Sequence, residues 1–326
     1  LSRAHVKSHT GGTRAAIEFY ESAPTPNVII VECDLDGDAL LDELNLLANV
    51  CDADTRVIVI GRRNDVELYR RLIKFGVSEY IVAPFDQMDL IRTIGEMFVA
   101  PDAEPLGHTI AFIGAKGGCG SSIMAQNVAW SISDIFQNEV ILADFDLAGG
   151  TVGLNFNQDP AQGMADALFT TEKLDEIYLD RILAKCSDHL NLLTAPASLE
   201  RTYEFSTEAV DRLVEVAQRS VPYFVADLPY QWSDWNVATM VAADEVVITT
   251  TPDLAGLRNT KNIYDLLRQK RKNDPKPHII LNQVGRSKET EIKPSAFEDA
   301  LETEMALIIP FEPNLFGTAM NNGQML

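Results

Sequence analysis

The chain has 326 residues, of which 46% are hydrophobic, and carries a formal net charge of −21. This length suggests about two domains with cores of their own, and the acidity disfavours nonspecific binding to nucleic acid, which requires a basic surface. The four cysteines are widely spaced, without a disulfide or metal-ligand pattern, which fits a reducing compartment. The sequence contains neither an evident signal peptide nor an apolar stretch long enough to span a membrane.

Residues 1–100 predict a small α/β domain. Three short apolar runs are typical of buried parallel strands, and a helix-like segment separates the second from the third. The runs are Asn27–Val31, Arg56–Ile60 and Tyr80–Val82, and the helical segment is Val66–Phe75. Strands that alternate with helices indicate a doubly wound sheet.

This pattern, and above all the segment Phe75–Phe85, resembles a response-regulator receiver, which has a flavodoxin-like fold. The first receiver strand is missing, and Glu32 stands where receivers carry their phosphoacceptor Asp. The lysine that receivers place before Pro-Phe is Ala83. We therefore expect a degenerate receiver-like domain that docks partners instead of being phosphorylated. A shifted alignment would leave Asp34 or Asp36 as an acceptor.

A polar, proline-bearing stretch at 101–107 predicts a linker to a second domain at 108–326. That domain opens with an apolar run that leads through a glycine-rich turn into a helix. Glycines let the backbone turn tightly and present its N–H groups to an anion at the positive end of a helix. The turn therefore predicts a phosphate-binding loop. Its residues are Lys116, Gly117, Gly118, Cys119, Gly120, Ser121 and Ser122.

Two apolar runs downstream of this loop end in carboxylates. The first ends at Asp144, with Asp146 just beyond it, and the second ends at Asp227. Side chains alternate along a strand, so one of the first pair can face the phosphates while the other supports the loop or holds an attacking water. Mg²⁺ prefers oxygen ligands, and the sequence predicts Ser122, Asp144 and Asp227 for that role.

The segment Lys116–Ser122 resembles the phosphate loop of the ParA/MinD ATPases, Lys-Gly-Gly-x-Gly-Lys-[Ser/Thr]. The leading signature lysine is kept, whereas the second lysine is Ser121. Within this family the chain is similar to the CpaE/TadZ branch, which positions the Tad (Flp) pilus assembly machinery in bacteria. The resemblance implies a P-loop NTPase domain with a mostly parallel, doubly wound sheet, which binds ATP and Mg²⁺. It also implies a chain trimmed at both ends.

The resemblance implies roles for individual residues. Lys116 matches the signature lysine, which reaches the partner's phosphates across a nucleotide-sandwich homodimer, and Asn282 matches an adenine contact. Together with the loop itself, Asn282 completes the predicted nucleotide ligands. The candidate catalytic residues are Asp146, Asp144 and Lys116.

The loss of the second lysine is expected to impair hydrolysis more than binding. Loop N–H groups still bind an anion, whereas one preorganised stabiliser of the transition state is worth about a hundred- to a thousandfold in rate. The expected function is therefore an ATP-binding, nucleotide-gated dimer with slow or negligible hydrolysis that organises Tad-type pilus assembly.

Pilus or polar-localisation proteins would dock on the receiver-like domain. The resemblance implies a cytoplasmic protein at a cell pole, or at the inner face of the membrane through its partners. Two alternatives stay open at this point. One is a partitioning or cell-division ATPase that cycles on DNA or membrane, and the other is a nucleotide-free scaffold.

Overall fold

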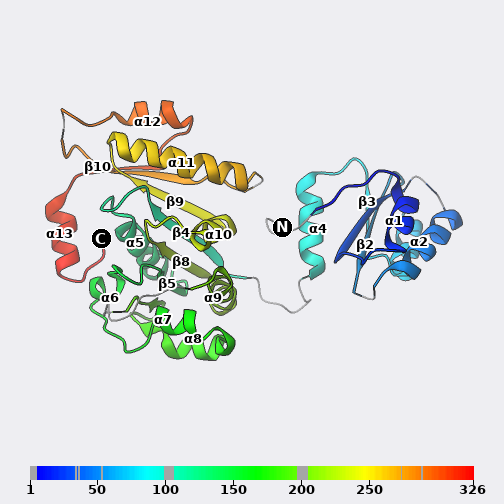
Figure 1. Cartoon of the computed structure of the whole chain (residues 1–326), viewed down its shortest axis with the longest axis horizontal. Helices are drawn as coiled ribbons and strands as arrows, with labels where there is room; N and C mark the ends of the chain where they lie inside the picture. Colours follow the sequence, from blue (N-terminus) through cyan, green and yellow to red (C-terminus); the bar gives the residue numbers. More distant parts are fainter. Residues whose placement is uncertain are drawn as a thin grey trace. The chain divides into compact units, whose positions relative to one another are not determined.

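The computed structural model describes residues 6–33, 35, 37–52, 54–98, 106–196, 205–272, 274–287 and 289–326. Contacts divide the chain into two compact units, with the boundary after Ala103 (Figure 1). Most of the predicted linker lies outside the described residues, as do Asp34 and Asp36.

The smaller unit has three parallel strands, each flanked by helices. The strands are β1 (Val28–Glu32), β2 (Arg56–Gly61) and β3 (Glu79–Val82), and the helices are α1 (Gly12–Tyr20), α2 (Asp38–Val50), α3 (Val66–Phe75) and α4 (Gln87–Phe98). Helix α3 begins where the Asp65 carboxylate accepts the N–H groups of Glu67 and Leu68, and it ends at Gly76 in the left-handed conformation. Leu68 and Leu72 on this helix are buried in the core of the unit.

The sheet of the smaller unit is parallel, and its strands lie in the order β1-β2-β3. The described residues therefore contain no reversal of strand order, so the doubly wound arrangement of this unit stays a prediction. Glu32, at the end of β1, has an exposed side chain whose carboxylate lies 3.9 Å from Arg62.

The larger unit contains an eight-stranded sheet in the order β11-β10-β9-β4-β8-β5-β7-β6, in which only β6 is antiparallel to its neighbour. The chain order reverses at β4, so the prediction of a mostly parallel, doubly wound sheet is confirmed. The strands are β4 (His108–Gly114), β5 (Val140–Asp144), β6 (Ala184–Lys185), β7 (Leu190–Leu193), β8 (Tyr223–Leu228), β9 (Glu245–Thr250), β10 (His278–Val284) and β11 (Leu307–Pro310).

Helices cover both faces of this sheet and bury a core on each. They are α5 (Ser121–Asp134), α6 (Val152–Asn155), α7 (Met164–Phe169), α8 (Glu176–Ile182), α9 (Thr207–Ser220), α10 (Asp234–Ala242), α11 (Leu254–Lys270), α12 (Pro294–Leu301) and α13 (Pro313–Asn321), with a 3₁₀ turn at Thr171–Lys173. Alternate residues of β4 enter the two cores, with Ala111 and Ile113 on one side and Phe112 on the other. None of the helices in the described ranges has the length and hydrophobicity of a membrane span.

The strand register brings the predicted acidic residues to one edge of the sheet. Strand β5 pairs with β8 so that Asp144 lies opposite Asp227. Strand β4, which pairs with β8 on its other side, leads at the same edge into the glycine-rich loop and α5. Ligands of open α/β sheets bind outside the carboxyl ends of the strands, where the strand order reverses.

Candidate functional site

A cavity of about 490 Å³ opens at this edge of the larger unit. Its volume lies in the range of small-molecule sites, roughly 300–1,000 Å³. The glycine-rich loop forms one wall, and the end of β10 together with the segments that follow β5, β8 and β11 contributes the others. Of the residues predicted from the sequence, the lining includes Lys116, Gly117, Gly118, Cys119, Gly120, Ser121, Ser122, Asp146, Asp227 and Asn282.

The glycine-rich loop has the backbone that a phosphate cradle requires. Gly118 and Gly120 have φ angles of 76° and 92°, which favour glycine. A Cβ atom on Gly120 would lie only 2.5 Å from Asn282 Nδ2, so a side chain there would displace the amide. Helix α5 follows directly, and its first N–H groups have no partner within the helix. The loop can therefore bind an anion with backbone groups alone.

Cys119 is a packing residue within this loop. Its side chain is buried, and burial raises the pKa of the thiol despite nearby backbone N–H groups that lower it. The thiol also occupies space beside Gly114, where an added Cβ would meet the Cys119 sulfur. A buried, protonated thiol is a poor nucleophile, so Cys119 is expected to be inert.

The end of strand β10 hydrogen-bonds to the phosphate loop. Asn282 Nδ2 donates to the Cys119 carbonyl at 2.9 Å, and Gln283 Nε2 donates to the Gly118 carbonyl at 2.9 Å. Asn282 was predicted to contact a base, whereas its amide nitrogen here hydrogen-bonds to the loop. Sequence reasoning did not identify Gln283, whose neighbour Arg286 donates to its Oε1 at 3.0 Å.

Ser121 and Ser122 stand at the start of α5 but differ in their partners. The Ser121 side chain is buried, and its Oγ has no hydrogen-bond partner among the described residues. The Ser122 hydroxyl lies near enough to Asp227 to lower the pKa of that carboxyl group. The two residues predicted as Mg²⁺ ligands, Ser122 and Asp227, thus lie close together, and Ser121 places an unpaired hydroxyl where the family loop carries its second lysine.

Asp227 is the most perturbed carboxyl group of the cavity. Its side chain is 4% exposed, and within the described structure its Oδ1 has no hydrogen-bond partner. Burial raises the pKa of Asp227 well above its usual value, and the charge of Asp144 raises it further against the hydrogen bond from Ser122. Such a group is stabilised when a cation approaches it.

Mg²⁺ fits this arrangement. Asp227 and Ser122 offer adjacent oxygen ligands, and Mg²⁺ is commonly bound by one or two protein groups together with phosphate oxygens and water. No cluster of three or more His, Cys, Asp or Glu side chains in the described ranges is placed to hold a metal by itself. Phosphate and water would therefore have to complete the coordination.

Asp144 has a different place from the predicted one. It is absent from the cavity lining, and its two oxygens accept the backbone N–H groups of Asp146 and Val152 at 3.2 and 3.1 Å. A Cβ on Gly150 would overlap this carboxylate. Burial raises the pKa of Asp144 to about 6, although these backbone hydrogen bonds lower it. The structure thus assigns Asp144 to holding the loop after β5, because its oxygens are committed to that loop.

Asp146 does face the cavity, as predicted for one member of the pair. Its Oδ1 accepts the N–H of Gly149 at 2.8 Å, which fixes the carboxylate at the start of the loop. The side chain is half-buried and therefore in reach of water. Of the two neighbouring carboxylates, Asp146 is the one placed to orient a water molecule or ligand.

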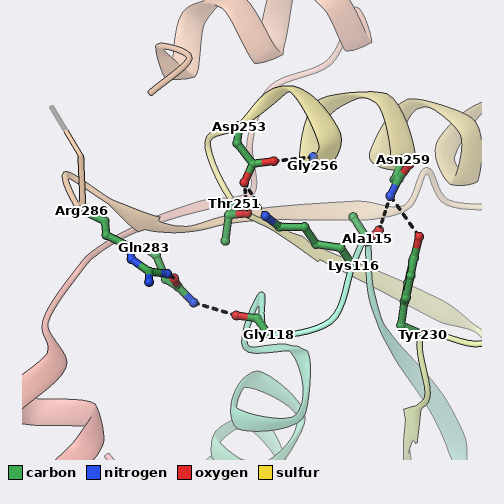
Figure 2. Close-up of polar contacts among 10 residues, drawn as sticks. All are labelled: Ala115, Lys116, Gly118, Tyr230, Thr251, Asp253, Gly256, Asn259, Gln283 and Arg286. Atoms are coloured by element: carbon green, nitrogen blue, oxygen red, sulfur yellow. Dashed lines mark hydrogen bonds and ion pairs between the residues drawn. The ribbon is translucent and has the colours of Figure 1, made fainter. Parts of the chain in front are cut away.

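Lys116 makes a contact that sequence reasoning missed. Its Nζ lies 2.5 Å from Oδ2 of Asp253, the residue that caps the N-terminus of α11 (Figure 2). Asp253 is an N-cap residue of a common kind, because its carboxylate accepts the N–H of Gly256 three positions later. The sequence held no signal for the pairing with Lys116, which spans 137 positions.

No family model matches this chain. Among curated proteins, an uncharacterized protein of Mycobacterium tuberculosis is 24% identical over 200 residues, which are 60% of this chain and 55% of the relative. The septum site-determining protein MinD of Bacillus subtilis is 23% identical over 184 residues, which are 55% of this chain and 66% of the relative. The chain thus spans between about half and two thirds of these relatives.

Solved structures resemble the larger unit. A ParA family ATPase from Chlorobium tepidum has a TM-score of 0.61 at 26% identity, over 67% of this chain and 90% of that chain. MinD from Pyrococcus horikoshii, complexed with Mg-ADP, has a TM-score of 0.58 at 18% identity, over 68% of this chain and 87% of that chain. Because the smaller unit cannot supply two thirds of the chain, the larger unit carries the fold of the ParA/MinD-family ATPases.

A shorter match exists to the pilus assembly protein CpaE of Caulobacter crescentus. It is 41% identical over 28% of this chain and 69% of that chain, with a TM-score of 0.27. A match of this extent and score carries no assignment of fold or role.

Proposed function

We propose that this protein binds ATP together with Mg²⁺ and that the bound nucleotide controls formation of a homodimer. The observation that carries the proposal is Asp227, a buried carboxylate close to Ser122 at the start of α5, one oxygen of which has no hydrogen-bond partner among the described residues. A cation bound by these two groups and by phosphate would remove the unfavourable burial of that charge. The Mg-ADP bound by a MinD of the same fold supports this choice of ligand.

The nucleotide's parts would be bound by different walls of the cavity. The loop Lys116–Ser122 would bind phosphates, and Asp227 with Ser122 would hold Mg²⁺. Asn282, Pro310 and Phe311 also line the cavity and would face the base. Asn282 would both contact the base and keep its hydrogen bond to the phosphate loop.

We further propose that hydrolysis is slow or negligible. Ser121 supplies a neutral hydroxyl where a lysine ammonium would stabilise the charge that develops on the transferred phosphoryl group. Lys116 is paired with Asp253 in the single chain, so it would need a rearrangement to take part. Asp146 would orient the attacking water, and the low rate would follow from the missing cation.

In the cell, the protein would organise a Tad/Flp-type pilus machinery. The support is the resemblance of the phosphate loop to the CpaE/TadZ branch and the absence of receiver chemistry at Glu32 and Ala83 in the smaller unit. That unit also presents exposed apolar side chains on α4, including Met88 and Phe98, which suit a docking role. Deletion of residues 1–104 should abolish localisation while nucleotide binding persists.

Calorimetric titration of the purified chain with ATP, once with Mg²⁺ and once with a chelator, tests the nucleotide proposal. We expect saturable binding that requires Mg²⁺ and a turnover far below the roughly 10 s⁻¹ of a typical enzyme. Absence of binding at millimolar Mg·ATP would contradict the proposal. Turnover at the ordinary rate would retain the ligand but reject the organiser with slow hydrolysis.

A further inference from the structure

Lys116 is held in place by a set of polar contacts within its own chain. Its ammonium contacts Asp253 Oδ2, and the Thr251 hydroxyl donates to the same oxygen at 2.7 Å. The second oxygen, Oδ1, accepts the N–H of Gly256 at 2.8 Å and so caps α11. Figure 2 shows Lys116 reaching across from the phosphate loop to this cap. Both oxygens of Asp253 therefore have partners, and its orientation is fixed by the helix.

The same helix contacts the phosphate loop at a second point. Asn259 Nδ2 donates to the Ala115 carbonyl at 3.0 Å and lies 3.0 Å from the Tyr230 hydroxyl (Figure 2). Ala115 directly precedes Lys116, and Tyr230 lies in the loop after Asp227. Helix α11 thus binds the loop through a neutral hydrogen bond at its base and through an ion pair at the lysine.

The ion pair involves the basic side chain of the described cavity. Lys116 is the one basic residue among those that line the described cavity, which also contains the carboxylates of Asp146, Asp227 and Glu312. While its ammonium contacts Asp253, Lys116 cannot also contact a phosphate group that lies farther away. Any rearrangement that brings the ammonium to a phosphate must first separate it from Asp253, while the Asn259 contact can persist.

We propose that Asp253 is a latch that retains Lys116 in the nucleotide-free chain and releases it when the dimer forms. This inference rests on the proposed function, since it concerns the regulation of the same site. Separating the pair opposes dimer formation, and binding of the lysine to phosphate favours it. Asp253 therefore sets the concentration of Mg·ATP at which the dimer appears, without itself contacting the nucleotide in the single chain.

The latch is tested by Asp253→Asn in the full-length chain. Asparagine keeps the oxygen that caps α11 but removes the charge that attracts Lys116. The contact is partly exposed, with side chains 31% and 41% accessible, and exposed ion pairs of this kind correspond to about a two- to fivefold change in an equilibrium. We expect the variant to dimerise at about two- to fivefold less Mg·ATP, measured by light scattering.

A second measurement needs no nucleotide. Lys116 should be acylated faster in Asp253→Asn than in the unchanged chain, measured by peptide mass spectrometry with an amine-reactive ester. The matched control is Asp265→Asn, which removes a carboxylate that pairs with Lys261 at 3.5 Å on the same helix. This control should alter neither the labelling of Lys116 nor the dimerisation midpoint.

The outcomes separate the latch from the proposed function. Unchanged labelling of Lys116 in Asp253→Asn would overturn the latch, because the pair would then not protect the lysine in solution. If the unchanged chain dimerises with Mg·ATP but Asp253→Asn has the same or a higher midpoint, the latch is overturned and the proposed function stands. If the unchanged chain binds no Mg·ATP, the proposed function fails, and the latch as its regulator fails with it.

Discussion

The two units of this protein both use parallel strands that end near acidic residues, yet only one of them builds a reactive edge. In the larger unit Asp227 is 4% exposed, its Oδ1 has no partner among the residues that the structure describes, and its pKa is raised well above the usual value. In the smaller unit the Glu32 side chain is 66% exposed, and its contact with Arg62 is 3.9 Å long. A position at a strand end therefore does not by itself perturb a carboxyl group, whereas burial raises its pKa.

The difference has an energetic basis. A buried carboxylate without full hydrogen bonding lowers the stability of the fold, so its presence indicates a ligand that neutralises it. An exposed pair such as Glu32 with Arg62 contributes roughly 0–1 kcal/mol and implies no ligand. Both units contain parallel strands flanked by helices, but the buried carboxylate of this comparison belongs to the larger unit.

The largest effect should come from Asp227→Asn. The substitution removes the charge that would hold Mg²⁺, so Mg²⁺-dependent ATP binding should weaken at least about tenfold, the change expected from loss of one charge-assisted contact. Calorimetry with and without Mg²⁺ measures it. Glu32→Gln is the matched control in the smaller unit and should bind as the unchanged chain does. If both variants weakened ATP binding equally, the difference between the two carboxylates would not explain the binding.

The next largest effect should come from a cation introduced into the proposed nucleotide site of the larger unit. Ser121→Lys places an ammonium beside the proposed phosphate position, and we expect hydrolysis to rise by about ten- to a hundredfold. Single-turnover assays with Mg·ATP measure the rate. Ser121→Met, of similar length but uncharged, should not accelerate the reaction. A rate that Lys and Met change alike would show that Ser121 does not limit turnover.

A smaller effect is expected from Gln283, which lies at the end of β10 and hydrogen-bonds to the phosphate loop. Gln283→Ala removes the hydrogen bond to the Gly118 carbonyl, and the loss of one such bond should weaken ATP binding by about two- to tenfold. Calorimetry provides the readout. Gln162→Ala, at an exposed position outside the cavity lining, serves as the control. Unaltered affinity in Gln283→Ala would mean that the loop keeps its shape without this contact.

The smallest effect concerns stability and its dependence on pH. Because the pKa of Asp227 is raised in the folded chain, its ionisation favours the unfolded state, and stability is lost as pH rises from the unfolded pKa near 3.9 toward the raised folded value. Asp227→Asn avoids this loss, so its melting temperature without nucleotide should exceed that of the unchanged chain by more at pH 7 than at pH 5. Calorimetric melting curves at the two values measure the difference. Glu32→Gln should show no such trend, and a gain that is larger at pH 5 would refute the assignment.

Much of the larger unit could be predicted from local sequence. The apolar runs that end at Asp144 and Asp227 indicated β5, which ends at Asp144, and β8, which ends one residue after Asp227, and the glycine-rich turn indicated the start of α5. The sequence also contains a helical stripe of Val210, Leu213, Val214 and Ala217, of which Val214 is partly buried and the others are buried in the core. These signals are local because they follow from the periodicity of a strand or helix.

The rest depended on contacts between distant segments. Nothing near Asp144 in the sequence distinguishes a carboxylate that accepts two loop N–H groups from one that faces a ligand. The contacts of Asn282 with Cys119 and of Lys116 with Asp253 join segments separated by 163 and 137 positions. The strand order of the smaller unit was likewise set by pairing, which the alternation of strands and helices does not specify.

The central claim is that the buried edge of the larger unit binds Mg·ATP and couples it to dimer formation through Lys116. Light scattering during a Mg·ATP titration of the unchanged chain and of Lys116→Ala tests it most directly. We predict that the unchanged chain doubles in mass with saturating nucleotide, and that Lys116→Ala binds nucleotide in calorimetry yet keeps the mass of a single chain. A single-chain mass for the unchanged protein at saturation, or equal dimerisation of Lys116→Ala, would contradict the account.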